Sequence, residues 1–204
     1  MANHRVPLWL KVSYLLWVAI WVPVYWTQHG PANLLWLCDV TNLFIAVALL
    51  LESPLIFSSQ AVGALLIQLA WMIDFLGRIV LGTHIIGGTE YMFVTAEPLW
   101  LRSMSLFHVF VPVLLIWAVW RLGYDRRGWK LESVIVWFIL PLSFVAAPPE
   151  KNLNWLWAPF GIDQTLVSPA YYLLFCMFAY PLVIFWTTHR LLLWWARRRG
   201  IRIY

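Results

Sequence analysis

Residues 54–73 read PLIFSSQAVGALLIQLAWMI, twenty consecutive residues without a charged side chain. Because an α-helix rises about 1.5 Å per residue, a stretch of about twenty apolar residues is long enough to cross the hydrocarbon core of a bilayer. Two glutamines, Gln60 and Gln68, lie within this stretch and do not shorten it. The segment therefore predicts a transmembrane helix.

Other apolar stretches of similar length flank this segment on both sides. The predicted spans are about 7–26, 33–51, 54–73, 104–122, 132–147 and 168–195. Of the 204 residues, 63% are hydrophobic and 11% are charged, a balance that a water-soluble domain of this length cannot bury. We therefore predict an all-α integral membrane bundle of about six transmembrane helices, with residues 1–204 forming a single transmembrane domain.

Basic residues are unevenly distributed between the predicted loops. With the N-terminus inside, the cytoplasmic segments carry eleven of the fourteen Lys and Arg residues: Arg5, Lys11, Arg121, Arg126, Arg127, Lys130, Arg190, Arg197, Arg198, Arg199 and Arg202. Because Lys and Arg are enriched on the cytoplasmic side of membrane proteins, both termini are predicted to be cytoplasmic. The basic segments suit lipid head groups, and no motif indicates a nucleic-acid partner.

Polar and ionisable side chains gather near the outer ends of the predicted spans. Such groups are costly inside a membrane and usually face protein or water, so their depth is informative. The members of this predicted outer polar layer are Asp39, Asn42, Asp74, Arg78, Arg102, His108, Lys151 and Asn152. A binding site that opens to the outer leaflet or to the outer aqueous phase would explain why the cytoplasmic half holds far fewer.

Asp39 and His108 are predicted to lie at similar depth on two different helices. A carboxylate can fix the tautomer of a histidine that acts as a general acid or base, and Cys38 or Thr41 is a candidate nucleophile beside Asp39. Alternatively, Asp39, Arg102 and His108 hydrogen-bond to one another and form only a structural clasp. The residue spacing leaves both interpretations open.

Two other arrangements in this layer have simpler interpretations. Asp74 and Arg78 are four residues apart on one predicted helix, which favours a structural ion pair. Asp39, Asp74 and His108 match no known metal-ligand spacing, so no metal site is predicted. The residues name no cofactor, and a single histidine at this depth argues against a haem with two histidine ligands.

Several segments resemble a bacterial family of small multi-pass membrane proteins whose activity is not established. They include WLCDVTNLF (residues 36–44), AWMIDFLGRIVLG (70–82), SLFHVFVPVLLIW (105–117) and PPEKNLNWLWAPFG (148–161), so that the resemblance spans nearly the whole chain. It supports the predicted membrane fold and implies no function.

A more distant resemblance is to the androgen-induced-protein family of six-span intramembrane hydrolases. These enzymes cleave lipid esters with a Thr on an early helix and a His on a later one, and FHVFVP places His108 about one turn before a proline, as in that family. The segment CDVTNLF is similar to the nucleophile segment. Alignment on Asn42 puts Asp39 at the nucleophile position, a shift of two residues selects Thr41, and related proteins that use Cys would implicate Cys38.

Three functions follow from these observations, and whether the protein is an enzyme stays open. We favour a non-catalytic accessory, scaffold or lipid-binding membrane protein, whose outer loops dock a protein partner in a membrane complex. The alternative is an intramembrane lipid-ester hydrolase or acyltransferase that uses His108 as its base. The third is a small-solute carrier, for which Gln60 and Gln68 on one helix face are the only hint of a polar path.

Overall fold

The computed structural model describes residues 6–162 and 164–204, and within these ranges the chain forms helices joined by loops, with one isolated backbone bridge between Tyr124 and Ile203. The bundle consists of α1 (Leu8–His29), α2 (Leu37–Leu51), α3 (Pro54–Leu81), α5 (Phe107–Leu122), α6 (Gly128–Ala146), and the continuous α7 (Pro169–Ala179), η7 (Tyr180–Phe185) and α8 (Trp186–Arg198). In the described ranges five helices are long and apolar enough to cross a membrane, and α2 is a shorter apolar helix. The predicted all-α membrane bundle is confirmed.

Short helices connect these elements. The connections contain η1 (Pro31–Leu35), η2 (Glu90–Phe93), α4 (Leu99–Ser103), η3 (Met104–Leu106), η4 (Pro149–Lys151), η5 (Leu153–Trp155) and η6 (Pro159–Gly161). Helix α4 and η3 run directly into α5, so that this helix effectively begins at Leu99. η7 is a π-helical turn that begins one residue before Pro181, where the missing backbone N–H breaks the regular ladder.

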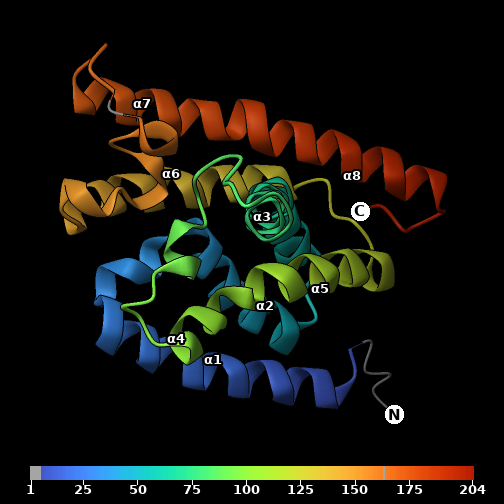
Figure 1. The fold of residues 1–204 in the computed structure, drawn as a ribbon. Helices are drawn as coiled ribbons and strands as arrows, with labels where there is room; N and C mark the ends of the chain where they lie inside the picture. Colours follow the sequence, from blue (N-terminus) through green and yellow to red (C-terminus); the bar gives the residue numbers. More distant parts are fainter. Residues whose placement is uncertain (1–5, 163) are drawn as a thin grey trace.

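Helix α3 lies at the centre of the bundle and packs against α2, α5, α6 and α8. In Figure 1, α1, α2 and α5 lie on one side of α3, and α6, α7 and α8 lie on the other. Within the first half of α3, residues 57–64 are all buried. This segment contains small and polar residues as well as apolar ones. This central position explains why α3 contributes side chains to both polar clusters described below.

Most helix boundaries differ from the predicted spans by a few residues, and two of these differences involve a buried acidic residue. Helix α3 continues to Leu81 instead of ending at residue 73, so that Asp74 and Arg78 are helical residues. Helix α6 begins at Gly128 instead of residue 132, because Glu132 is buried against α3 and is not the polar edge of a loop. A charged residue in an apolar stretch suggested a boundary, and the tertiary packing overrode it.

Helices α3 and α6 approach closely where glycines remove the side chains. A Cβ atom on Gly128 would lie 2.8 Å from the Ser58 and Ser59 backbone, and a Cβ on Gly63 would collide with the carboxylate of Glu132. The backbone of Ser58 and Ser59 cannot move as easily as the end of a flexible side chain. The crossing of α3 and α6 therefore requires glycine at residue 128.

Gly128→Ala is expected to lower the free energy of unfolding by about 1–3 kcal/mol, the usual range for overpacking. Thermal unfolding of the detergent-solubilised protein would measure the effect. Gly88→Ala is the matched control, because its Cβ would meet Trp155 at an ordinary 3.6 Å. Equal melting temperatures for the two variants would refute the close packing of these helices.

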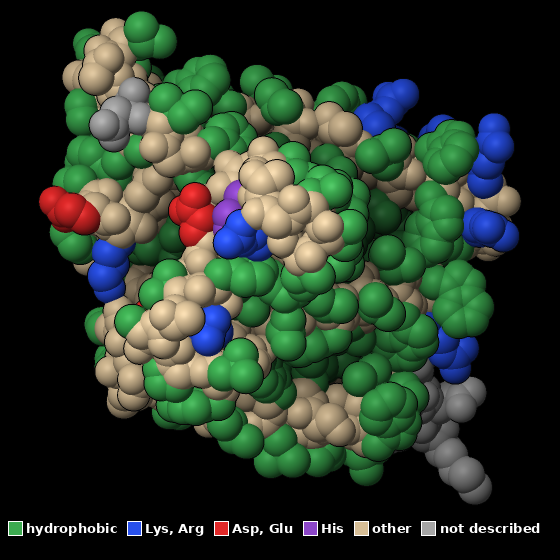
Figure 2. Space-filling view, viewed as in Figure 1, with side chains coloured by type: hydrophobic (Ala, Val, Ile, Leu, Met, Phe, Trp, Pro, Cys, Tyr) green, Lys and Arg blue, Asp and Glu red, His purple; other side chains and the backbone are tan. Residues whose placement is uncertain are grey.

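Lys and Arg side chains gather at the end of the bundle where α1 begins, α5 ends and the chain terminates, on the right of Figure 2. We call this the basic end and the opposite end the outer end. Lys11 forms an ion pair with Glu52 there, at 2.7 Å, which joins α1 to the end of α2. Arg5, part of the orientation prediction, lies outside the described residues. The arrangement agrees with the predicted sidedness, which remains a prediction.

The turn before α6 is fixed at the basic end by hydrogen bonds from several elements. The backbone N–H of Asp125 donates to the Ser58 hydroxyl at 2.8 Å, and that of Tyr204 donates to the Tyr124 carbonyl at 2.9 Å. The Asp125 carboxylate accepts from the backbone and the guanidinium of Arg127. These Arg127 hydrogen bonds lower the pKa of Asp125, and burial opposes them.

This lowered pKa gives a pH-dependent contribution to stability. A carboxyl whose folded pKa lies below its unfolded value, about 3.9 for Asp, stabilises the fold above that value and loses this contribution as the pH falls through the folded pKa. The melting temperature of the wild type should therefore fall more steeply below about pH 4 than that of Asp125→Asn. Parallel pH profiles for the two proteins would exclude this role for Asp125.

Candidate functional site

His108 lies in the first turn of α5, where its ring is held between two aromatic rings. The centroid of Trp71 on α3 is 4.5 Å away on one side, and that of Phe107 is 4.2 Å away on the other. Its Nδ1 atom is 2.7 Å from the carbonyl oxygen of Ser105. Because a carbonyl can only accept, Nδ1 carries the proton and the neutral ring has its lone pair on Nε2. His108 is therefore held in the tautomer that a general base at Nε2 requires.

Ser105 also connects His108 to α1. Its hydroxyl lies 2.8 Å from the Tyr25 hydroxyl, while its carbonyl accepts the hydrogen bond from His108. Ser105 is buried, and it belongs to η3, the short helix that leads into α5. The junction between η3 and α5 thus positions the histidine and a phenol together.

Tyr91 on η2 closes the same region from the loop side. Although 38% of its surface is exposed, its hydroxyl end points inward and accepts a hydrogen bond from the indole nitrogen of Trp71 at 3.1 Å. Burial of the phenol raises the pKa of Tyr91; a hydrogen bond with Ser105 lowers it, and the neighbouring Tyr25 and Cys38 groups raise it. The Tyr91 hydroxyl is therefore close to groups from four other segments, α1, α2, α3 and η3.

Asp39 is buried in the first turn of α2 with few partners. Cys38 Sγ donates to its Oδ1 at 3.8 Å, and the amide nitrogen of Asn33 donates to its Oδ2 at 3.5 Å, both long contacts. The carboxylate and the Cys38 thiol also act electrostatically on the Tyr25 phenol. In residues 6–162 and 164–204 no cation forms an ion pair with Asp39. Asp39 is thus a buried carboxyl group whose hydrogen bonds are few and long.

These side chains form one group toward the outer end of the bundle, which we call the outer cluster. Its members are Tyr25, Cys38, Asp39, Trp71, Tyr91, Ser105 and His108. The group combines a base, a thiol, a carboxylate, an indole and three hydroxyls from α1, α2, α3, α5, η2 and η3. Such a combination can bind a polar head group and can also move a proton.

The predicted clasp of Asp39, Arg102 and His108 is not formed. Arg102 donates to the carbonyl oxygens of Glu97 and Met92 in its own loop. His108 bonds to a backbone carbonyl, and Asp39 has only the two long contacts above. Arg102 and His108 therefore donate their hydrogen bonds to nearby backbone carbonyls and not to Asp39.

Thr41 and Asn42 have structural partners within reach. The Thr41 hydroxyl donates to the carbonyl of Leu37 one turn earlier in α2, at 2.9 Å. The Asn42 side chain accepts from the Tyr14 hydroxyl at 2.9 Å and donates to the Cys38 carbonyl at 3.1 Å, which joins α1 to α2. Asn42 thereby helps to fix the backbone at Cys38.

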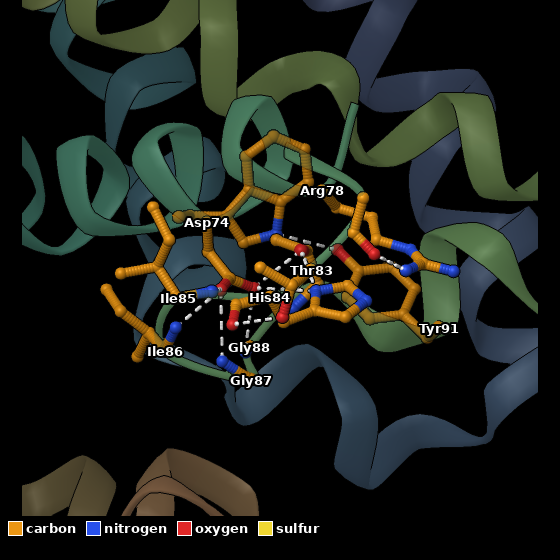
Figure 3. A network of polar contacts seen from close by, with 12 residues as sticks. Asp74, Arg78, Thr83, His84, Ile85, Ile86, Gly87, Gly88 and Tyr91 are labelled. Carbon is orange, nitrogen blue, oxygen red and sulfur yellow. Dashed lines mark hydrogen bonds and ion pairs between the residues drawn. The ribbon is translucent and has the colours of Figure 1, made fainter. Parts of the chain in front are cut away.

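Asp74 organises the outer loop that follows α3 (Figure 3). Its two carboxylate oxygens accept from the backbone N–H groups of residues 85, 86, 87, 88 and 89 and from the Thr89 hydroxyl, at 2.6–3.0 Å. His84 Nδ1 lies 3.2 Å from the same carboxylate. The predicted ion pair with Arg78 is not formed, because the loop amides occupy the carboxylate and Arg78 bonds to the carbonyl of Gly82 instead.

Asp74→Asn is expected to release this loop and to lower the free energy of unfolding by about 1–3 kcal/mol, because an amide nitrogen would face N–H donors. Hydrogen exchange of the amides in residues 85–89 should become faster. Arg78→Gln removes only the contact with Gly82 and a cation–π contact with Phe93, and it serves as the control. Unchanged exchange in Asp74→Asn would contradict the anchoring role.

The loop after α6 holds the remaining predicted residues. Lys151 donates to the last carbonyl of α1, at His29, and Asn152 bonds to the backbone of Trp157 and Ala158. Asn154 lies nearby in a left-handed conformation, and its side chain accepts from the first N–H of α2, at Leu37. This loop therefore positions the start of α2, which carries Cys38 and Asp39.

Sequence reasoning missed several members of the outer cluster. Tyr25, Trp71, Tyr91 and Ser105 carry no charge, so the sequence gives no reason to separate them from the other residues of the spans and loops. Spacing from His108 was the available signal for Ser105, which lies one turn earlier on the same helix. Glu132, the buried acidic residue of α6, is also not among the predicted site residues, because the predicted span begins at residue 132.

No group of three or more His, Cys, Asp or Glu side chains that could hold a metal ion occurs among the described residues. Comparison with family models, curated proteins and solved structures gives no match to this chain. The fold and the outer cluster thus define the class by themselves: a multi-pass helical membrane protein with a buried group of histidine, carboxylate and thiol toward one end.

Proposed function

We propose that the outer cluster is the active site of a membrane enzyme that cleaves or transfers the acyl group of a lipid ester. The observation that carries the proposal is the hydrogen bond from His108 Nδ1 to the Ser105 carbonyl, which leaves Nε2 as a fixed proton acceptor. Tyr25, Tyr91 and Ser105 supply hydroxyls around it that can bind an ester or its head group. The distant resemblance to intramembrane hydrolases selects the same histidine.

Cys38 is the nucleophile that these contacts favour. Thr41 already donates its hydroxyl proton to the Leu37 carbonyl, whereas the Cys38 thiol has only a long contact with the Asp39 carboxylate and is partly accessible. A thiol is also the stronger nucleophile once it is deprotonated. Asp39 is the positioning residue beside it.

The reaction would proceed in two balanced steps. The thiol transfers its proton to His108 Nε2, and the sulfur attacks the ester carbonyl; the C–O bond breaks, and the departing alcohol takes the proton from His108. This leaves a thioester on Cys38. Water, or a second alcohol, then gives a proton to Nε2 and attacks the thioester, which releases the fatty acid or a new ester and returns the thiol.

A second candidate function is binding of an amphiphile without chemistry, as a lipid-binding or scaffold protein. One observation favours it: among the described residues no hydrogen bond joins Cys38 to His108. In enzymes without substrate such contacts are often long and shorten on binding, so geometry alone does not decide. The clasp that supported a purely structural layer is not formed.

The proposed setting is a bacterial cytoplasmic membrane with the outer cluster toward the outer leaflet. The gathering of Lys and Arg side chains at the basic end (Figure 2) supports this orientation. Membrane lipids are then the substrates and neighbours, and a protein partner would bind at the outer loops.

The test is hydrolysis of a panel of lipid esters and short-chain esters by the protein reconstituted in lipid. The proposal expects turnover of at least one ester, with reduced turnover in Asp39→Asn. Ester binding without turnover, unchanged by Asp39→Asn, would favour the second candidate. If the protein neither binds nor hydrolyses any ester of the panel, both candidate functions are wrong.

A further inference from the structure

A second polar group lies between α3 and α6, close to the basic end and apart from the outer cluster. The Ser59 hydroxyl donates to Glu132 Oε2 at 2.5 Å, and Gln60 Nε2 donates to the same oxygen at 2.9 Å and to Ser59 Oγ at 3.3 Å. Ser59 and Gln60 have no exposed surface, and Glu132 is 3% exposed. A carboxyl group is therefore enclosed inside the bundle.

Glu132 has no counter-charge in this enclosure. The segments that pack around it carry these titratable or charged groups: Asp74 and Arg78 on α3, Lys130 on α6, Tyr124, Asp125, Arg126 and Arg127 in the preceding turn, Tyr171, Tyr172, Cys176 and Tyr180 on α7 and η7, and His189, Arg190, Arg197 and Arg198 on α8. Asp125 is paired with Arg127, and Tyr124 is bonded to His189. Within the described ranges none of these groups forms an ion pair with Glu132.

The cluster also has more acceptor atoms than donors. Both donors bond to Oε2, so among the described residues Glu132 Oε1 receives no hydrogen bond. The amide oxygen of Gln60 is buried without a partner as well. Gly63 faces the carboxylate and leaves room that any larger residue would fill. Oxygens that lack donors, on a buried carboxyl group without an ion-pair partner among the described residues, suit the binding of a positive species.

The polar groups continue along α3 in both directions. Toward the basic end, the hydroxyl of the buried Ser58 accepts from the backbone N–H of Asp125 at 2.8 Å. Toward the middle, Gln68 lies two turns beyond Gln60, fully buried, and neither of its amide atoms has a partner. Unsatisfied buried amides are rare in folded proteins, and in membranes such groups mark ion and proton pathways.

We propose that Ser59, Gln60 and Glu132 form an exchangeable site for one small monovalent cation, a proton or Na⁺, that enters from the basic end. One carboxylate balances one positive charge. The cation would take the oxygens that now lack donors, Glu132 Oε1 and Gln60 Oε1. Its function is separate from that of the outer cluster, and the site would couple the protein to a proton or sodium gradient.

Labelling by a hydrophobic carbodiimide, which adds to protonated carboxyl groups in apolar surroundings, tests the site in lipid nanodiscs. Label on Glu132 should be absent in Glu132→Gln. If the cation is a proton, labelling should fall by about tenfold per pH unit above the pKa of the group. If the cation is Na⁺, replacement of choline chloride by NaCl at fixed pH should reduce labelling, and Ser59→Ala should weaken this protection.

Infrared difference spectra of wild type minus Glu132→Gln report on the same carboxyl even where the reagent does not reach it. Conversion of a carboxylic acid band to a carboxylate band with rising pH, or a shift of the band on addition of NaCl, supports the site. A carboxylic acid band that stays unchanged at every pH and in NaCl overturns it, because Glu132 would then be a permanently protonated structural group. This result is independent of ester turnover.

Discussion

His108→Ala should reduce the rate of ester hydrolysis by about 10²–10⁴-fold, the range that general acid–base catalysis contributes. The Ser105 carbonyl holds Nδ1 as the donor, so Nε2 is the atom that takes the proton from the thiol and returns it to the leaving alcohol. Loss of the ring removes this transfer in both steps. Initial rates with the best ester of the panel measure the effect.

His189→Ala is the matched control for this variant. His189 is also buried and also bonds through Nδ1, in its case to the Tyr124 hydroxyl at 2.7 Å, but it lies at the basic end. Its loss should affect stability and leave the rate per folded molecule unchanged. Equal losses of rate in both variants, at equal melting temperatures, would show that His108 acts only through the fold.

Cys38→Ala should abolish ester turnover, because no other group of the outer cluster can form the thioester. Cys176→Ala is the control, since Cys176 is buried on α7 and is the only other cysteine of the chain. Cys38→Ser should keep the fold and retain at most a small part of the rate, because a hydroxyl is the weaker nucleophile. Full activity in Cys38→Ala would transfer the role to Thr41 or to an activated water.

The transmembrane fold could be predicted because apolar stretches such as residues 54–73 are long enough to cross a membrane. The helix boundaries are harder to predict where a charged residue is buried against another helix. Glu132 suggested the start of a span, although α6 begins at Gly128, because the sequence does not show that Ser59 and Gln60 lie opposite. The same limit hid the cation site.

The candidate site was predicted in part for a related reason. His108 and Asp39 were selected because ionisable residues inside spans are rare, and both are buried near the outer end. Their partners followed from tertiary packing: the loop amides at residues 85–89 bind Asp74, and backbone carbonyls bind Arg102 and His108. Backbone acceptors are present at every residue, so a pattern of side chains cannot predict which of them is used.

The covalent step is the central claim, and mass spectrometry of the protein stopped during turnover tests it most directly. The account predicts an added acyl group on the peptide that contains Cys38, released by hydroxylamine and absent in Cys38→Ala. Turnover of ester without any acyl group on Cys38, at the same rate in Cys38→Ala, would contradict it.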